Sequence, residues 1–455
     1  MALIQSHDPS DIVIDSIVIT SDRLGDQLFN ITLNVLEFNV YESLDTIGIE
    51  ADMVILDDNA IHEQIDFQGQ ENITIRCSWP ELDGEVWERK FICTSVTSAT
   101  KATNDQTQML TLNMIDVDSY QDKLININRK YDGNPKQILA QIIADNFRGK
   151  QLFTNDNVFQ GAMRVIVPNW NPYECMKYIK NRATSPSGAP YYCYTVHGDE
   201  HIRFFDLETM LDTTSIGMPY YFAEMLSQSG DFFNKVGKSY LVQGVTIPEQ
   251  DDMFTQIADG NVGAQYGFLD TQNFYDNSFK FDITQVFRSM LKRTKIITTK
   301  KAPLFDASFR GKDRSLQSYS SRNIMNVGTT SVYNDIPGYY EDVTPEHHST
   351  KAIAKALRRF IQKTPITIRV SGRNFFMPGK NLTSSIGSLI DFQMLDKRPI
   401  VRMSNIAEHT DYKRSGLHLI YSARYLIKRA GAATKVTAAL KLCKLSNTEG
   451  ISRVS

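Results

Sequence analysis

The chain has 455 residues, of which 42% are hydrophobic and 22% charged, and a formal net charge of −3 at pH 7. This composition excludes disordered and fibrous proteins, and the length predicts two to four domains with sizeable cores. The N-terminus has no basic segment followed by an apolar run, and no apolar stretch is long enough to cross a bilayer, so we expect neither a signal peptide nor membrane insertion.

The cysteines are few, odd in number and widely spaced: Cys77, Cys93, Cys175, Cys193 and Cys443. That usage is typical of free, mostly buried thiols in a reducing compartment. We therefore expect the protein to be made in a cytoplasm.

The small net charge conceals an asymmetry between the two ends of the chain. Residues 1–120 contain 22 Asp and Glu against 5 Lys and Arg, and residues 351–455 contain 5 against 20. One interpretation is two solvated surfaces that keep the protein soluble. The other is that the acidic and basic ends meet, within a chain or between neighbours, because opposite fields orient association. The basic residues are spread along predicted strands and a helix without a compact aromatic and basic motif, which disfavours sequence-specific DNA binding.

Residues 1–120 are predicted to form a first β-barrel. Strands are expected at 12–20, 29–43, 51–58, 72–79, 89–96 and 108–117, with turns at Leu24–Gly25–Asp26 and Asp57–Asp58–Asn59. Short strands at this spacing without an intervening helix indicate a barrel or sandwich.

Residues 121–215 are predicted to form a small α/β domain. Helices are expected at 133–147, capped by Asn134 with Pro135 in the first turn, and at 169–183, where Asn171 and Pro172 repeat the arrangement. A hairpin follows at 189–207, turning at His197–Gly198–Asp199.

The remaining chain divides into an insertion, a second barrel and a tail. Residues 216–350 are predicted to be an interaction region that contributes some strands to the second barrel, with regular structure at 239–247 and 279–299. A helix is expected at 349–365 with a basic side, and a second β-barrel over 351–445, including a tight turn at Pro378–Gly379. Residues 446–455 are expected to be a flexible tail.

Two distant segments have the same pattern. Residues 90–117 and 415–445 each open with a short apolar run, cross a small-residue and basic linker, and continue as an alternating strand. One face of the first strand carries Leu110, Leu112 and Met114, and one face of the second carries Val436, Ala438, Leu440 and Leu442. Alternation of this length is typical of a half-buried antiparallel strand, so we expect two copies of one β-barrel.

Candidate catalytic and metal sites are weak. Cys193, His197 and His201 recur every four residues but straddle a hairpin turn without a fourth ligand, so a core cysteine and turn histidines are the better interpretation. Glu346–His347–His348 precedes the predicted helix and lacks the histidine spacing of zinc proteases. We expect no catalytic residues, no cofactor and no metal.

Five pieces of sequence follow one another along nearly the whole chain: "VYESLDTIGIEADMVILDDNAI", "QIDFQGQENITIRC", the "VPNWNPYECMKYIKNRA" to "IRFFDLETM" unit, "GRNFFMPGKNL" and "SGLHLIYSARYLI". Their order resembles that of the baseplate hub protein of contractile-tailed bacteriophages. The resemblance implies a β-rich α+β fold with two tube-protein-like antiparallel barrels, an inserted α/β domain and an irregular insertion.

The resemblance also implies a structural, non-enzymatic role in the virion tail. Three subunits would form a quasi-sixfold ring that joins the tail tube to a central spike. The implied partners are the spike, the tail tube protein, the tape-measure protein and baseplate wedge proteins. DNA would pass through the channel of the ring without recognition of its sequence. Two alternatives stay open: the hub of a phage-derived injection or secretion system, and a tail-associated envelope-degrading enzyme.

The charge asymmetry gives a candidate interface between subunits. If the two barrels alternate around a ring, acidic and basic segments become neighbours, which favours unlike contacts over like ones. The residues proposed for this interface are Glu81, Asp83, Glu85, Glu88, Lys413, Arg414 and Arg424.

Overall fold

The structure is a computed structural model. It describes residues 10–25, 27–58, 60–79, 86–101, 108–155, 163–222, 238–247, 253–258, 263–270, 275–280, 319–328, 345–362, 365–376, 385–395, 414–430 and 433–444, with a few short pieces between them. The predicted turn at Pro378–Gly379, most of 279–299 and the tail 446–455 lie outside these residues.

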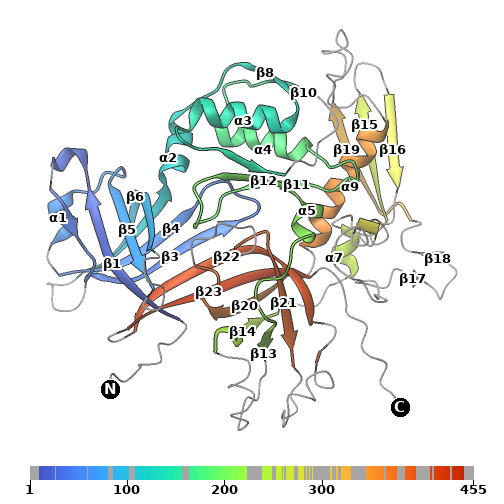
Figure 1. Cartoon of the computed structure of the whole chain (residues 1–455). Helices are drawn as coiled ribbons and strands as arrows, with labels where there is room; N and C mark the ends of the chain where they lie inside the picture. Colours follow the sequence, from blue (N-terminus) through green and yellow to red (C-terminus); the bar gives the residue numbers. More distant parts are fainter. Residues whose placement is uncertain are drawn as a thin grey trace.

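The largest element is a 13-stranded sheet that contains strands from both ends of the chain (Figure 1). We call the strands from its N-terminal part the first strand set: β1 (Asp11–Thr20), β3 (Val35–Ser43), β4 (Glu50–Asp57), β5 (Asn72–Ser78), β6 (Val86–Lys101) and β7 (Gln108–Asp116). The second strand set is β13 (Tyr220–Phe222), β14 (Val242–Thr246), β20 (Pro365–Ser371), β21 (Leu389–Met394), β22 (Gly416–Ala430) and β23 (Ala433–Lys444). The short strand β2 (Phe29–Asn30) pairs with β1.

The two strand sets have the same strand order. The first set is arranged β3-β4-β7-β6-β5-β1 and the second β14-β20-β23-β22-β21-β13. Two irregularities coincide as well: β3 has an extra residue at Leu36 and β14 at Gln243, while β6 has one at Thr94 and β22 at Tyr421. Two others have no counterpart, an extra residue at Ser98 in β6 and one at Asp15 in β1. Bulges fix register, so the two shared bulges align the strands that carry them, and equivalent residues are identified through their register partners. One pair differs, because β13 is parallel to β21 whereas β1 is antiparallel to β5.

The hairpin of β22 and β23 joins the two sets. β22 pairs with β3 and β23 pairs with β1, so the first set and this hairpin form a closed circuit of strand pairings. The second set closes through a single bridge between Tyr221 and Leu241. The long hairpin therefore takes part in both circuits and lies between the two ends of the first set (Figure 1).

The predicted alternation is confirmed in both matching segments. Leu110, Leu112 and Met114 are at most 1% exposed, and Val436, Ala438, Leu440 and Leu442 are fully buried. The predicted linkers are wrong, however, because β6 continues to Lys101 and β22 continues to Ala430. In β22 the basic residues Arg424 and Lys428 are exposed, and such a composition resembles a linker.

Two helices in or beside the first set were not predicted, and they correct the expectation of uninterrupted strands. α1 (Ile61–Ile65) follows β4, and the carboxylate of Asp57 accepts hydrogen bonds from the backbone N–H groups of Ile61 and His62. α2 (Val117–Leu124) follows β7, and Asp116 accepts one from Ser119 N–H. In both places an Asp at the end of a strand satisfies the free N–H groups of a helix start.

The inserted α/β unit has its own core. Its elements are β8 (Lys130–Gly133), α3 (Pro135–Asn146), β9 (Leu152–Thr154), β10 (Met163–Ile166), α4 (Pro172–Arg182), β11 (Tyr191–Tyr194), β12 (Ile202–Asp206) and α5 (Leu207–Leu211). The predicted cap of α3 is confirmed, since Asn134 Oδ1 accepts from Gln137 N–H at 2.8 Å. α4 begins with the same arrangement of Asn and Pro. A separate group of buried side chains, including Ile138 and Met176, lies between α3, α4 and the strands.

Part of the insertion forms a further small sheet. β15 (Ala264–Asp270) lies between β16 (Tyr275–Lys280) and β19 (Arg322–Gly328), beside α7 (Met253–Ala258), and β17 (Ser308–Phe309) pairs with β18 (Arg314–Ser315). The described residues also form two short 3-10 helices, η1 (Asp22–Leu24) and η2 (Lys238–Tyr240). β13 and β14 come from this insertion and join the large sheet.

The helix α9 (Pro345–Ile361) begins earlier than predicted, so Glu346, His347 and His348 belong to it rather than precede it. Its basic side is not wholly solvated. Arg358 donates hydrogen bonds to the carbonyls of Lys180 and Tyr191 at 2.9 Å, and burial lowers its pKa. Because α9 leads into β20, Arg358 ties the inserted unit to the second strand set.

Candidate functional site: the seam between the two strand sets

The seam is the line along which β22 of the second set pairs with β3 of the first. Seven register partners run from Ser422 opposite Ser43 to Lys428 opposite Glu37. On the other side of the hairpin, β23 meets β1 at Asp11 opposite Lys435 and Ile12 opposite Thr434. The seam is the place where residues nearly four hundred positions apart form one continuous sheet.

The outer face of the seam brings the acidic and basic ends of the chain together. Lys428 Nζ lies 3.6 Å from the Glu37 carboxylate. Arg429 donates to the carbonyls of Leu33 and Thr32 at 2.8 and 3.1 Å. The ends of opposite charge therefore meet within one chain, one of the two arrangements that the charge asymmetry predicted. An exposed pair of this kind stabilises by at most about 1 kcal/mol, so its main effect is on register.

A chain of polar contacts crosses the same face. Arg424 Nε donates to Asn39 Oδ1 at 3.0 Å, and the Asn39 side-chain amide donates to the Asp52 carboxylate at 2.8 Å. Tyr41 also donates to Asp52, at 3.0 Å. Burial, with the hydrogen bond and charge of Asp52, raises the pKa of Tyr41 to about 12. The network links β22, β3 and β4.

The inner side of the seam contains a buried carboxylate, Glu42, that sequence analysis missed. Its Oε2 accepts hydrogen bonds from His197 N–H at 2.9 Å and lies 3.1 Å from His197 Nδ1. Its Oε1 accepts from Tyr425 at 2.6 Å and from the Ser385 hydroxyl. Burial would raise the pKa of Glu42, but the charge of His197 and these hydrogen bonds together hold it below its usual value.

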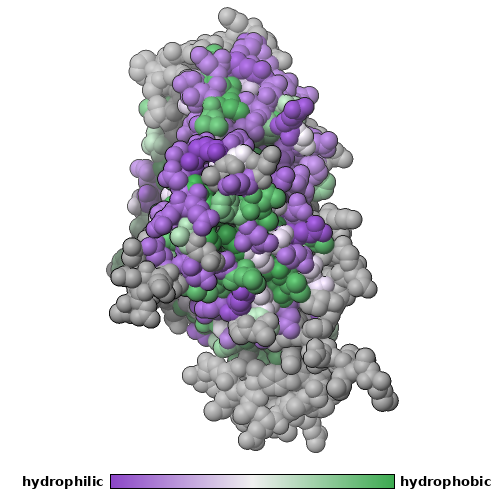
Figure 2. All heavy atoms as spheres, turned by 90° about the vertical axis from the view of Figure 1, so that its left-hand side faces the viewer, coloured by the Kyte–Doolittle hydropathy of each residue, from purple (hydrophilic) through white to green (hydrophobic). Residues whose placement is uncertain are grey.

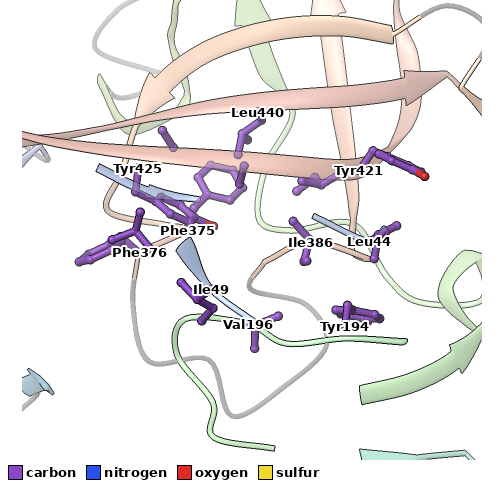
Figure 3. Packing of buried hydrophobic residues seen from close by; sticks show 14 of the residues in the cluster. Leu44, Ile49, Tyr194, Val196, Phe375, Phe376, Ile386, Tyr421, Tyr425 and Leu440 are labelled. Atoms are coloured by element: carbon purple, nitrogen blue, oxygen red, sulfur yellow. The ribbon is translucent and has the colours of Figure 1, made fainter. Parts of the chain in front are cut away.

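His197 connects this carboxylate to the inserted unit. Its ring stacks on Phe376 with ring centroids 4.8 Å apart and an interplanar angle of 7°. Its carbonyl accepts from Trp87 Nε1 and from Arg89. Figure 3 shows the apolar surroundings, where Tyr425, Phe375 and Phe376 lie between the hairpin and the segments that carry Ile49 and Val196. The first set, the second set and the inserted unit thus meet at a single polar cluster inside an apolar core.

Of the residues proposed for a subunit interface, three are described. Arg424 is exposed on β22 and makes the contacts above. Arg414 lies 2.9 Å from Asp411, and Glu88 is exposed on β6 opposite Arg76. Glu81, Asp83, Glu85 and Lys413 lie outside the described residues. A role of these residues between subunits stays a prediction.

The candidate metal and thiol residues do not come together. Cys193 is buried in β11, His197 pairs with Glu42, and His201 N–H donates to Asp199. No group of three or more His, Cys, Asp or Glu in the described part of the chain could hold a metal ion. His197 lies in the predicted turn, but it is only 2% exposed, so this turn residue is buried rather than at the surface.

All five cysteines are free and buried, as predicted. Burial raises the pKa of the Cys93, Cys175, Cys193 and Cys443 thiols to about 12, and raises that of Cys77 further. Burial thus disfavours the thiolate, the form in which a cysteine reacts as a nucleophile.

Comparisons with known proteins identify the fold. The structure is similar to the 43 kDa tail protein of prophage MuSo2 from Shewanella oneidensis, with a TM-score of 0.51 and 11% identity over 95% of this chain and 98% of that one. It is also similar to the tail protein from Neisseria meningitidis MC58, with a TM-score of 0.50 and 10% identity over 94% of this chain and 96% of that one. The chain has the fold of phage tail proteins.

A further match is a component of the Escherichia coli type VI secretion system, with a TM-score of 0.42 and 10% identity over 97% of this chain and 79% of that one. No protein-family model and no curated protein match the sequence. Among the described helices, none is long and apolar enough to span a membrane.

Proposed function

We propose that the chain is a structural subunit of a phage tail baseplate, a hub in which two barrels per chain give a ring of six barrels from three chains. The observation that carries the proposal is the repeated strand order and register of the two strand sets. Three chains with two equivalent units each would form a ring of six units. One side of that ring could contact a sixfold tube, and the other side a threefold spike. The similarity to tail proteins along almost the full length supports the same conclusion.

The proposed partners follow from that position: a central spike, the tail tube protein, the tape-measure protein and the baseplate wedge proteins. The ring would surround a channel that passes DNA without reading its sequence. We propose no enzymatic activity, and a peptidoglycan clearing assay tests this directly. Clearing by the purified protein would favour the envelope-degrading alternative.

Two measurements test the hub. Light scattering of the purified protein should give three times the 51.7 kDa chain mass. Antibodies raised against the chain should label isolated tails at the end of the tube that carries the spike. A monomeric protein, or label along the whole tube or on the capsid, would contradict the proposal. Neighbouring genes for capsid proteins would separate a phage hub from the hub of an injection machine.

A further inference from the structure

Among the described residues, two strand edges that correspond to the two sides of the seam have no backbone partner. In the seam, β22 pairs with β21 only as far as Leu419. The strand then continues, and its residues 422–428 pair with the outer edge of β3. β6 is the equivalent of β22, and it extends past the end of its pairing with β5 at Ile92 as far as Lys101. Within the described residues, no backbone pairing covers the outer edge of β6 from Ser95 to Lys101.

The equivalent of β3 is β14, and its outer edge is equally open. β14 pairs with β20 on one side. On its other side, the described residues provide only the bridge of Leu241 to Tyr221, which lies just before the strand. Open strand edges favour pairing with another chain, and proteins cover them where they can.

The exposure of equivalent side chains supports a missing neighbour at β14. Phe38 and Val40 of β3 are fully buried where β22 covers them. Their equivalents are Val245, which is half-buried, and Ile247 just after β14, which is 38% exposed. The second set thus has apolar groups in place for a contact that the first set already makes within the chain.

We propose that β6 of one copy of the chain adds antiparallel to β14 of a neighbouring copy, as β22 adds to β3 inside the chain. The inference rests on the proposed assembly of three copies, in which it supplies the contact between copies. Such a contact joins two different surfaces, so it generates a closed ring if the rotation returns to its start.

The repeat also gives the register of this contact. Thr100 of β6 is the equivalent of Leu426, because Thr100 is opposite Met109 where Leu426 is opposite Thr437. Thr246 of β14 is the equivalent of Asn39 of β3, because Thr246 is opposite Thr367 of β20 where Asn39 is opposite Asp52 of β4. Leu426 is opposite Asn39 in the seam. Thr100 of one copy therefore lies opposite Thr246 of the next.

The space-filling view agrees with an interacting surface on the first strand set. Figure 2 shows the side of the molecule that carries α1, β1, β5 and β6, and hydrophobic residues gather in its middle among hydrophilic ones. Exposed apolar side chains of the first set are Val13 and Met109, and Leu28 and Leu33 are exposed in the segment between β1 and β3. We assign only the edge of β6 to the contact.

Disulfide cross-linking tests the register. Opposite residues of antiparallel strands have Cα atoms about 4.5–5.5 Å apart, within the range that a disulfide spans. Oxidation of a T100C/T246C variant should give covalent species of two and three chains on a non-reducing gel. A mixture of the two single variants should give only a two-chain species, and T100C/V242C, which is out of register, should give none. An E37C/K428C variant, with cysteines at register partners in the seam, should cross-link within the chain and controls for folding and oxidation.

The outcomes separate this inference from the proposed function. Three-chain assemblies without a T100C/T246C cross-link, while E37C/K428C cross-links, would overturn the inference and leave the trimer standing. Equal cross-linking of the out-of-register variant would also overturn it. A protein that stays monomeric at all concentrations would overturn both.

Discussion

Replacement of Glu42 by alanine should destabilise the whole junction between the two strand sets and the inserted unit. Three donors lose their acceptor, namely the His197 backbone N–H, the Tyr425 hydroxyl and the Ser385 hydroxyl, and the contact with His197 Nδ1 is lost as well. Hydrogen bonds to a charged group contribute about 1.5–3 kcal/mol each, but the cost of burying the carboxylate offsets much of their sum. Removing one member of a buried pair costs about 3–5 kcal/mol, and we expect a loss of this size for Glu42→Ala.

Urea unfolding followed by tryptophan fluorescence measures this loss, because Trp87 contacts His197 directly. Tyr425→Phe keeps the ring and removes a single donor, so it should cost about 1.5–3 kcal/mol. Glu63→Ala, at an exposed position of α1, is the matched control and should change stability by less than about 0.5 kcal/mol. A Glu42→Ala variant within about 1 kcal/mol of the parent would refute the reasoning that this cluster holds the junction together.

The pH dependence of this loss has a definite sign. The pKa of Glu42 is lower in the folded protein than its ordinary value of 4.5. The ionised carboxylate therefore contributes stability that is fully present above pH 4.5 and is lost as the pH falls through the folded pKa. The difference in unfolding free energy between parent and Glu42→Ala should shrink as the pH falls below 4.5. A difference that grows in acid would contradict the assignment.

Three further predictions concern the seam and the core. Glu71→Gln should cost about 1–3 kcal/mol in urea unfolding, because it weakens the 2.9 Å contact between the buried Glu71 carboxylate and the partly exposed Arg23 side chain. An unchanged midpoint would count against it. Leu440→Ala should cost about 2–5 kcal/mol by leaving a cavity under the hairpin, and a cost below 1 kcal/mol would show that the core there is loose. Arg424→Glu should lower the thermal midpoint of unfolding, because it places a carboxylate beside the Asn39–Asp52 contact. Loss of trimer assembly at an unchanged thermal midpoint would instead support a role of Arg424 between subunits.

Local pattern predicted the strands well, because alternation and capping are encoded in neighbouring residues. The helix α3 followed from Asn134 and Pro135, and the matching faces of β7 and β23 followed from period-two alternation. α2 was missed although it has a sequence signal: Asp116 ends a strand and Ser119 follows three residues later, the spacing of an N-cap contact.

The seam could not be predicted, because a sequence alone does not show which distant strands pair. The sequence does contain one indication of the polar cluster inside the seam. Glu42 lies two residues after Val40 and four after Phe38, in phase with the buried face of its strand, and an acid at a core position needs a partner. That partner, His197, is 155 residues away and could be found only from the fold.

The central claim is that one chain contains two equivalent strand sets, so that three chains present six similar units. Electron-microscope projection averages of the purified assembly, viewed down its axis, test this most directly. The account predicts a ring of six similar lobes around a central channel. A ring with three lobes, or with two unlike lobes alternating at different radii, would contradict it.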